Sequence, residues 1–452
     1  MPFIPHTRDD EKIMLDTIGV DAIEDLFDEI PKEIRAGELE QIPTGIGEME
    51  LMREMNSRAA KDEMELCFIG AGAYQHHIPA AVWDLVSRGE FLTAYTPYQA
   101  EASQGTLQLI YEFQSMMTQL TGLDVSNASV YDGASALAEA VLMAVRANRK
   151  SKSRAILFAG NGNPYYRKAM QSIVCNQDIE IQDIPWDAET GTIDPDELKR
   201  WDDEDITAIV ITNPNFFGGL ERIDELTKWA HAKGTLVIAV VNPVSLALLK
   251  PPGQWGDSGA DIAVGDGQPL GIPMASGGPY FGFMCCKQNI VRQMPGRIIG
   301  RTVDLEGREG FTLTLQAREQ HIRRAKATSN ICTNQGLLVS AATIYMSLMG
   351  PKGMSTVAAT CHANMQRLIG KLTAVEGAEV WFKGPVFHEL VIKLDKPAGD
   401  VLDAMAEQRI LGGLELARCL PGVTDGILVN VTETKTDADL DRFIDCLKQA
   451  LA

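Results

Sequence analysis

The stretch Asp261–Pro273 reads DIAVGDGQPLGIP, a short apolar run followed by a loop rich in glycine and proline. Such a run, bounded by turn residues, is typical of a buried strand. Similar runs occur at residues 155–159, 179–184, 208–212, 235–241 and 280–286, and stretches with helical periodicity alternate with them. Strands that alternate with helices predict a mainly parallel sheet covered on both faces, so the predicted fold class is α/β.

A helical arm is predicted to precede this body, over residues 1–66. Its apolar residues recur at helical spacing before a proline ends the run: Ile23, Leu26, Phe27 and Ile30, then Pro31. An amphipathic segment of this kind needs a surface to pack on.

A smaller α/β domain is predicted to follow the body. A long apolar helix begins near Gln335 and leads to β-rich runs near 380, 390–394 and 427–431. The predicted domains are therefore 1–66, 67–330 and 331–452.

Composition argues against two classes of function. The 452 residues carry a formal net charge of -20, which would repel nucleic-acid phosphates and anionic lipid surfaces. The first residues lack the basic start and apolar run of a signal peptide, and no uninterrupted apolar stretch is long enough to span a membrane, so a cytoplasmic location is expected. The eight cysteines show no metal-binding spacing; we expect them to be reduced and buried, and we expect no metal site.

The segment 94–105, AYTPYQAEASQG, gathers tyrosines, amides, hydroxyls and a carboxylate around a proline. Such a density of hydrogen-bonding side chains outside a regular element suggests a binding loop, and a polar surface turn is the alternative. The candidate pocket residues are Tyr95, Thr96, Tyr98, Gln99, Glu101 and Gln104.

Three other segments are candidates for the site. Residues 131–139 begin an alanine-rich helix whose free N–H groups could hold a phosphate, although a close-packed helix start explains them equally well. Asn215 follows a buried strand, at the end where open α/β sheets bind ligands, and the neighbouring aromatics could instead plug the sheet as core. The basic segment 318–330 is either a solvated face or an anion-binding element.

Together these motifs resemble the glycine decarboxylase P-protein family. The resemblance runs from the N-terminus to the last strand and includes residues 95–105, NFFG at 215–218, GRTVD at 300–304 and KATSNICTNQ at 326–335. It implies the type I fold of pyridoxal-phosphate enzymes, with an aspartate-aminotransferase-like sheet. The family occurs as one long chain or as two shorter chains, and this chain resembles the N-terminal (alpha) one.

The resemblance also reveals two missing groups. In the family's working half, a lysine holds pyridoxal phosphate as an imine and an aspartate keeps the pyridine ring protonated. Gln268 stands where the lysine should follow the strand 261–264, and a glutamine amide cannot form an imine. Asn242 ends the stretch where the aspartate should sit. Lys250, Lys287 and Lys326 lie elsewhere, so no catalytic residue is expected in this chain.

In this fold the active site lies between paired subunits, so the resemblance implies that the chain completes the site of a lysine-bearing partner. The polar residues of 95–104 and Asn215 would line that pocket. Thr328, Ser329 and Asn330 would reach the cofactor phosphate across the interface. These roles are carried over by analogy.

The implied reaction is decarboxylation of glycine as its pyridoxal-phosphate aldimine, with transfer of the aminomethyl group to the lipoyl arm of the H protein. The implied partners are P-protein subunit 2 and H protein, in a heterodimer or heterotetramer functionally linked to the T and L proteins. Two alternatives are an independent pyridoxal-phosphate enzyme, which requires a reactive lysine, and a structural or regulatory homologue without an active-site role.

Overall fold

The computed structural model describes residues 5–36, 41–92 and 96–452, in two compact units, Met1–Glu63 and Met64–Ala452. The α-helices are α1 Arg8–Ile18, α2 Glu48–Ala59, α3 Ala80–Val86, α4 Gln104–Thr121, α5 Gly133–Ala147, α6 Pro164–Val174, α7 Ile223–Lys233, α8 Gln320–Arg323, α9 Gly336–Leu372, α10 Ala398–Glu407 and α11 Asp437–Leu451. The strands are β1 Leu66–Cys67, β2 Val125–Ser126, β3 Ala155–Ala159, β4 Glu180–Ile184, β5 Ala208–Thr212, β6 Leu236–Val240, β7 Ile262–Asp266, β8 Gly282–Cys286, β9 Ile298–Val303, β10 Glu309–Thr314, β11 Ala378–Val380, β12 Glu389–Leu394, β13 Ile410–Leu411, β14 Leu414–Glu415 and β15 Gly426–Asn430.

The larger unit is built on a seven-stranded sheet with the order β2-β8-β7-β6-β5-β3-β4. Strands β3 to β7 pair in parallel, and β8 runs antiparallel to both of its neighbours. The predicted α/β class and its strand runs are confirmed.

Both faces of this sheet are buried. Leu157 and Ala159 of β3 belong to one apolar cluster together with residues of α4 and α9, while Ile156 and Phe158 belong to another together with α5. This alternation follows from the two-residue period of a strand. Each face therefore carries its own helical layer, as an α/β sheet requires.

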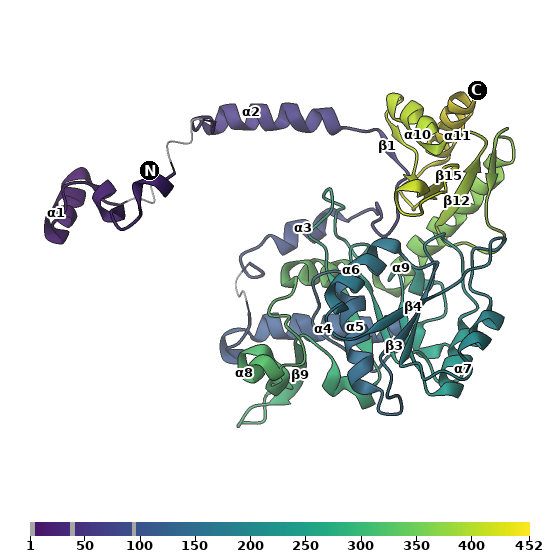
Figure 1. Ribbon diagram of the computed structural model, residues 1–452, viewed down its shortest axis with the longest axis horizontal. Helices are drawn as coiled ribbons and strands as arrows, with labels where there is room; N and C mark the ends of the chain where they lie inside the picture. Colours follow the sequence, from purple (N-terminus) through teal and green to yellow (C-terminus); the bar gives the residue numbers. More distant parts are fainter. Residues whose placement is uncertain (1–4, 37–40, 93–95) are drawn as a thin grey trace. The chain divides into compact units, whose positions relative to one another are not determined.

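A second, antiparallel sheet with the order β11-β12-β15-β14 forms near the C-terminus (Figure 1). Its core combines the strands with α10, α11 and the second half of α9, which breaks at Gly350 (φ 57°) before Pro351. The strand β1 pairs with β13, and Phe68 packs on Phe443 of this core. The predicted strands and long helix are confirmed, whereas the predicted domain boundaries remain a proposal.

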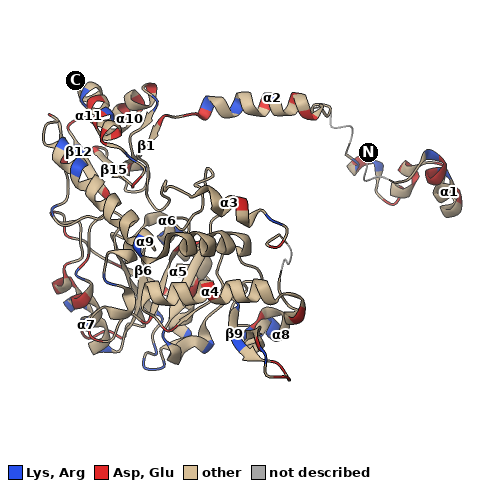
Figure 2. Ribbon diagram, turned by 180° about the vertical axis from the view of Figure 1, so that it is seen from behind, with Lys and Arg blue, Asp and Glu red and all other residues tan. Residues whose placement is uncertain are grey.

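The smaller unit holds α1, α2 and short 3₁₀ turns. The prediction of an α-helix through Ile23–Ile30 is wrong: only Ile23–Phe27 is helical, as a 3₁₀ turn. The Asp25 carboxylate accepts from the backbone N–H groups of Asp21 and Ala22, which fixes a turn before the α-helix can form. Helices α1 and α2 have no buried residue, and charged residues are distributed along both (Figure 2).

The structure also tests the predictions on membrane spans and on the cysteines. Among the residues described, no helix has both the length and the apolarity to cross a bilayer. All eight cysteines are free, and five are buried as expected; Cys67 is only partly buried, and the prediction is wrong for Cys175 and Cys332, which are exposed.

Candidate functional site

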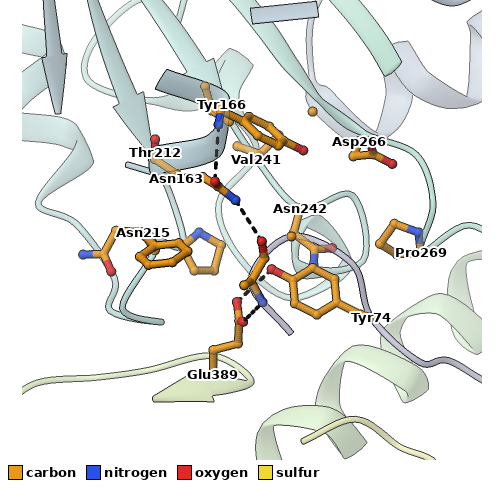
Figure 3. A pocket seen from close by; sticks show the side chains of 16 residues that line it. Tyr74, Asn163, Tyr166, Thr212, Asn215, Val241, Asn242, Asp266, Pro269 and Glu389 are labelled. Atoms are coloured by element: carbon orange, nitrogen blue, oxygen red, sulfur yellow. Dashed lines mark hydrogen bonds between the residues drawn. The ribbon is translucent and has the colours of Figure 1, made fainter. Parts of the chain in front are cut away.

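A polar pocket lies at the carboxyl ends of β5, β6 and β7, where open α/β sheets bind ligands (Figure 3). Its cavity measures about 60 Å³. At about 10–15 Å³ for each water molecule, that space holds only a handful of waters. The lining residues are Ala71, Gly72, Tyr74, Asn163, Tyr166, Thr212, Pro214, Asn215, Phe216, Val240, Val241, Asn242, Gly265, Asp266, Pro269 and Glu389.

Gln268, predicted to stand at the position of the cofactor lysine, lies in the loop after β7. Its side chain is buried, and its Oε1 accepts from the Tyr74 backbone N–H at 2.8 Å. Its Nε2 donates to the carbonyls of Tyr74 (2.9 Å) and Ile272 (2.8 Å). The amide thus fastens the segment before α3 to the loop after β7, a task that needs both a donor and an acceptor.

The start of α5 already has a hydrogen-bond acceptor from within the chain. Asp266 Oδ2 accepts from the backbone N–H of Gly133, the first residue of α5, at 3.0 Å. Asp266 Oδ1 accepts from the Gln268 N–H at 2.8 Å. Burial raises the pKa of Asp266 to about 7 although both N–H groups favour its charged form. A Cβ on Gly133 would overlap the Tyr166 hydroxyl, so this helix start is also crowded.

Glu389 closes the opposite side of the pocket. Its Oε1 accepts from the Ala71 N–H at 2.7 Å, and its Oε2 accepts from the Tyr74 hydroxyl at 2.7 Å. Burial raises its pKa to about 7. Figure 3 shows this carboxyl group beside Tyr74, with Asn163 bonded to the Ala71 carbonyl.

Pyridoxal phosphate does not fit this pocket. No lysine is among its described lining residues, and the Asp266 carboxyl group occupies the helix start that a phosphate would need. Asn242, at the expected aspartate position, contacts His388 Nε2 through its Nδ2 at 3.2 Å. Lys250 and Lys287 are each 2.7 Å from an aspartate, Asp224 and Asp261 respectively, and neither lines the pocket.

The family model for the glycine cleavage system P-protein matches residues 1–447. The chain belongs to this P-protein family. Proteins named probable glycine dehydrogenase (decarboxylating) subunit 1 match it along its whole length. The one from Alcanivorax borkumensis is 64% identical over 453 residues, covering 100% of both chains. The one from Nitrosomonas europaea is 60% identical over 452 residues, covering 100% of this chain and 99% of the relative.

Solved structures agree with the P-protein assignment. A crystal structure of glycine decarboxylase (P-protein) in inhibitor-bound form superposes with a TM-score of 0.89 at 39% identity, covering 100% of both chains. A sphingosine-1-phosphate lyase from Burkholderia pseudomallei superposes with a TM-score of 0.66 at 18% identity, covering 93% of this chain and 94% of the lyase. The fold is the type I fold of pyridoxal-phosphate enzymes.

The predicted polar loop of this P-protein chain lies at the surface. Tyr98 is 54% exposed, and Gln99 and Glu101 are also exposed. Thr96 is half-buried, and Tyr95 lies outside the described residues. Exposure leaves Tyr98, Gln99 and Glu101 free to meet another molecule, and their predicted roles there stay predictions.

Gln104, a predicted pocket residue, also joins two elements through hydrogen bonds. Its Oε1 accepts from the Phe311 N–H and its Nε2 donates to the Phe311 carbonyl, both at 2.8 Å. A third bond runs from Nε2 to the Ala100 carbonyl at 2.8 Å. The amide therefore holds the β9–β10 hairpin against the first turn of α4.

Arg297 joins the two predicted site segments and was missed by sequence reasoning. One of its guanidinium nitrogens, Nη2, donates to Thr96 Oγ1 (3.2 Å) and to the Cys332 carbonyl (2.8 Å). Its guanidinium carbon lies 5.8 Å from the centre of the Tyr98 ring. The His321 ring centre lies 5.6 Å from the centre of the same Tyr98 ring, with the two rings tilted by 67°. A lone arginine after Pro295-Gly296 carries no motif, so only the fold could identify it.

The predicted phosphate-reaching residues differ in availability. Ser329 Oγ donates to Glu139 Oε1 at 2.9 Å, and burial raises the pKa of that carboxyl group. The Thr328 N–H donates to the Arg318 carbonyl at 3.0 Å, while Asn330 is exposed. Asn215 lies apart from these residues in the buried pocket, where both ends of its amide are hydrogen-bonded.

Proposed function

We propose that this chain is the non-lysine subunit of a heteromeric glycine decarboxylase and completes the active site of a lysine-bearing P-protein subunit 2. The observation that carries the proposal is Gln268, an amide with three hydrogen bonds at the lysine position of a chain similar throughout to subunit 1 proteins. A second subunit must then supply the lysine.

Pyridoxal phosphate, held by the partner, would supply the electron sink for decarboxylation of glycine. This chain would supply surface and orientation. Tyr98 presents a hydroxyl on an exposed ring that contacts both Arg297 and His321. Tyr95, Thr96, Gln99, Glu101 and Thr328 to Asn330 belong to the two segments that Arg297 ties together. The lipoyl group of H protein is the proposed acceptor of the aminomethyl group.

The test is to incubate the purified chain with pyridoxal phosphate, alone and with subunit 2, to reduce with borohydride and to map the labelled peptide. We expect the label on a subunit 2 lysine and glycine decarboxylation only in the mixture. A stoichiometric label on a lysine of this chain, with activity when it is alone, would instead identify an independent enzyme.

A second arm separates a completing subunit from a structural homologue. Tyr98→Phe removes one hydroxyl, and we expect turnover by the mixture to fall roughly tenfold, the scale of one lost hydrogen bond. Tyr165→Phe, on another exposed tyrosine, is the matched control and should leave turnover unchanged. Equal turnover by both variants would contradict a role for Tyr98 in the shared site.

A further inference from the structure

A second group of reactive side chains lies outside the pocket described above. His76 precedes α3, Cys361 lies in α9, and Glu433 follows β15. One ligand atom from each of the three residues lies within 4.8 Å of the other two. These are the three side-chain types that bind zinc most often: imidazole nitrogen, thiolate sulfur and carboxylate oxygen.

His76 and Cys361 both contact the same oxygen of Glu433. Glu433 Oε2 is 2.8 Å from His76 Nδ1 and accepts from the Cys361 thiol at 3.2 Å. Glu433 Oε1 accepts from the His77 backbone N–H at 2.7 Å, which fixes the carboxylate. The Cys361 residue is fully buried, and the His76 and Glu433 side chains are 2% and 12% exposed.

Polar atoms without partners surround this group. Among the residues described, His76 Nε2, Tyr345 Oη and His388 Nδ1 are buried and make no hydrogen bond. The rings of His76 and His388 are 6.5 Å apart. Burial raises the pKa of Tyr345, and Glu433 and Cys361 raise it further, which places the phenol beside the same group. Buried polar atoms are rarely left unpaired, so a metal ion that carries a bound water at this position would give Tyr345 and His388 a hydrogen-bond partner.

We propose that His76, Cys361 and Glu433 bind a zinc ion. Zinc bonds to nitrogen and oxygen measure about 2.0–2.2 Å and bonds to sulfur about 2.3 Å, so ligand atoms around a tetrahedral ion lie roughly 3.3–3.7 Å apart. The two pairs that share Glu433 Oε2, now 2.8 and 3.2 Å, would lengthen to that spacing as the ion enters, and all three atoms already lie within 4.8 Å of one another. On binding, the Cys361 thiol loses its proton to solvent as the sulfur–zinc bond forms. A water molecule takes the fourth position, and Tyr345 and His388 are available to hydrogen-bond around it.

The zinc ion would tie together three segments distant in sequence. The segment that carries His76 also carries Tyr74, whose backbone N–H and carbonyl are hydrogen-bonded to the Gln268 side chain. Cys361 lies after the break in α9, and Glu433 follows the last strand of the C-terminal sheet. The proposed role is therefore structural, and it does not depend on the proposed function of the chain.

The test uses the full-length chain, supplied with zinc, freed of loose metal by gel filtration and measured by plasma mass spectrometry. We expect about one zinc ion per chain, lost in Cys361→Ala and in Glu433→Gln. Cys446→Ala, which changes another buried cysteine, should keep its zinc. Cobalt in place of zinc should give a thiolate-to-cobalt absorption band that only Cys361→Ala removes among the cysteine variants.

Folding is checked on the same samples by circular dichroism. A variant that unfolds is replaced by His76→Gln, which keeps an amide hydrogen-bonding group near Glu433. The proposal is overturned if the folded wild-type chain holds less than roughly a tenth of an equivalent of zinc. It is also overturned if the cobalt band is the same in wild type and in Cys361→Ala.

Discussion

Gln268, which we predict to stand at the position of the cofactor lysine, is held by three hydrogen bonds. Its amide supplies an acceptor to the Tyr74 N–H and donors to two carbonyls. An ammonium group has donors only, so a lysine at this position could not replace all three bonds.

Gln268→Lys is therefore expected not to restore cofactor binding. The Tyr74 N–H loses its acceptor, at a cost of about 1–3 kcal/mol in the free energy of unfolding, and Asp266 still occupies the start of α5. Denaturant unfolding should show the loss, and borohydride treatment with pyridoxal phosphate should leave the protein unlabelled. A stoichiometric label at position 268 would show that the pocket can open.

Buried carboxyl groups predict a dependence of stability on pH. Burial raises the pKa values of Glu221, Asp266 and Glu389 to about 7. In the unfolded chain these groups lose their protons near pH 4. Their contribution to stability is therefore full below about pH 4 and is lost as the pH rises through 7.

Glu389→Gln tests this dependence. The Gln oxygen can accept from the Ala71 N–H and its NH₂ can donate to the Tyr74 hydroxyl, so the pairing survives without a charge. We expect the variant to be more stable than wild type at pH 8, by up to the order of 3 kcal/mol, and equal to it near pH 4. Thermal unfolding across this range is the measurement, with exposed Glu204→Gln as control. A difference that is the same at every pH would contradict the assigned pKa.

At the scale of elements, the central strands β3, β5 and β7 of the large sheet could be predicted because each is a short apolar run buried on both faces. The 3₁₀ turn at Ile23–Phe27 could not, because its spacing matches a helix and the outcome depends on the Asp25 carboxylate. For the site, the sequence alone predicts that Gln268 stands where the family has its cofactor lysine. The hydrogen bond from the start of α5 to the Asp266 carboxyl group could not be predicted, because only the fold brings residues 133 and 266 together.

Arg297 is hydrogen-bonded to both site segments, which leads to a prediction for Arg297→Gln. The shorter side chain cannot span Thr96 and the Cys332 carbonyl, so both segments should loosen. We expect faster hydrogen exchange in residues 96–103 and 327–334 and a roughly tenfold loss of turnover in the mixture, with little change in global stability. Arg308→Gln, in the turn between β9 and β10, is the control. Unchanged exchange and turnover would show that Arg297 is dispensable.

At the scale of the whole molecule, the chain divides into a unit with extensive cores and one without. Met64–Ala452 contains the apolar clusters, whereas the helices of Met1–Glu63 bury nothing and expose apolar residues such as Phe27 (53%) and Met49 (74%). Exposed apolar surface of this extent is typical of a segment that packs on another protein.

Deletion of residues 1–63 should therefore separate folding from assembly. We expect the remaining chain to unfold at nearly the same temperature as the full chain, because the main cores lie in residues 64–452. Its affinity for subunit 2, measured by analytical ultracentrifugation, should fall by tenfold or more, roughly 1.4 kcal/mol. Full affinity after deletion would assign the arm another task.

The Asp266 carboxyl group at the start of α5 makes the stability of this chain independent of the supply of vitamin B6. An enzyme that binds a vitamin-derived cofactor only in its folded state is less stable against unfolding when the vitamin is scarce. Here the carboxyl group that accepts from the start of α5 is encoded in the polypeptide, at residue 266, and is present in every copy made. In cells starved of vitamin B6, this chain should keep its half-life while a cofactor-dependent partner is degraded, leaving a standing stock ready for assembly when the vitamin returns.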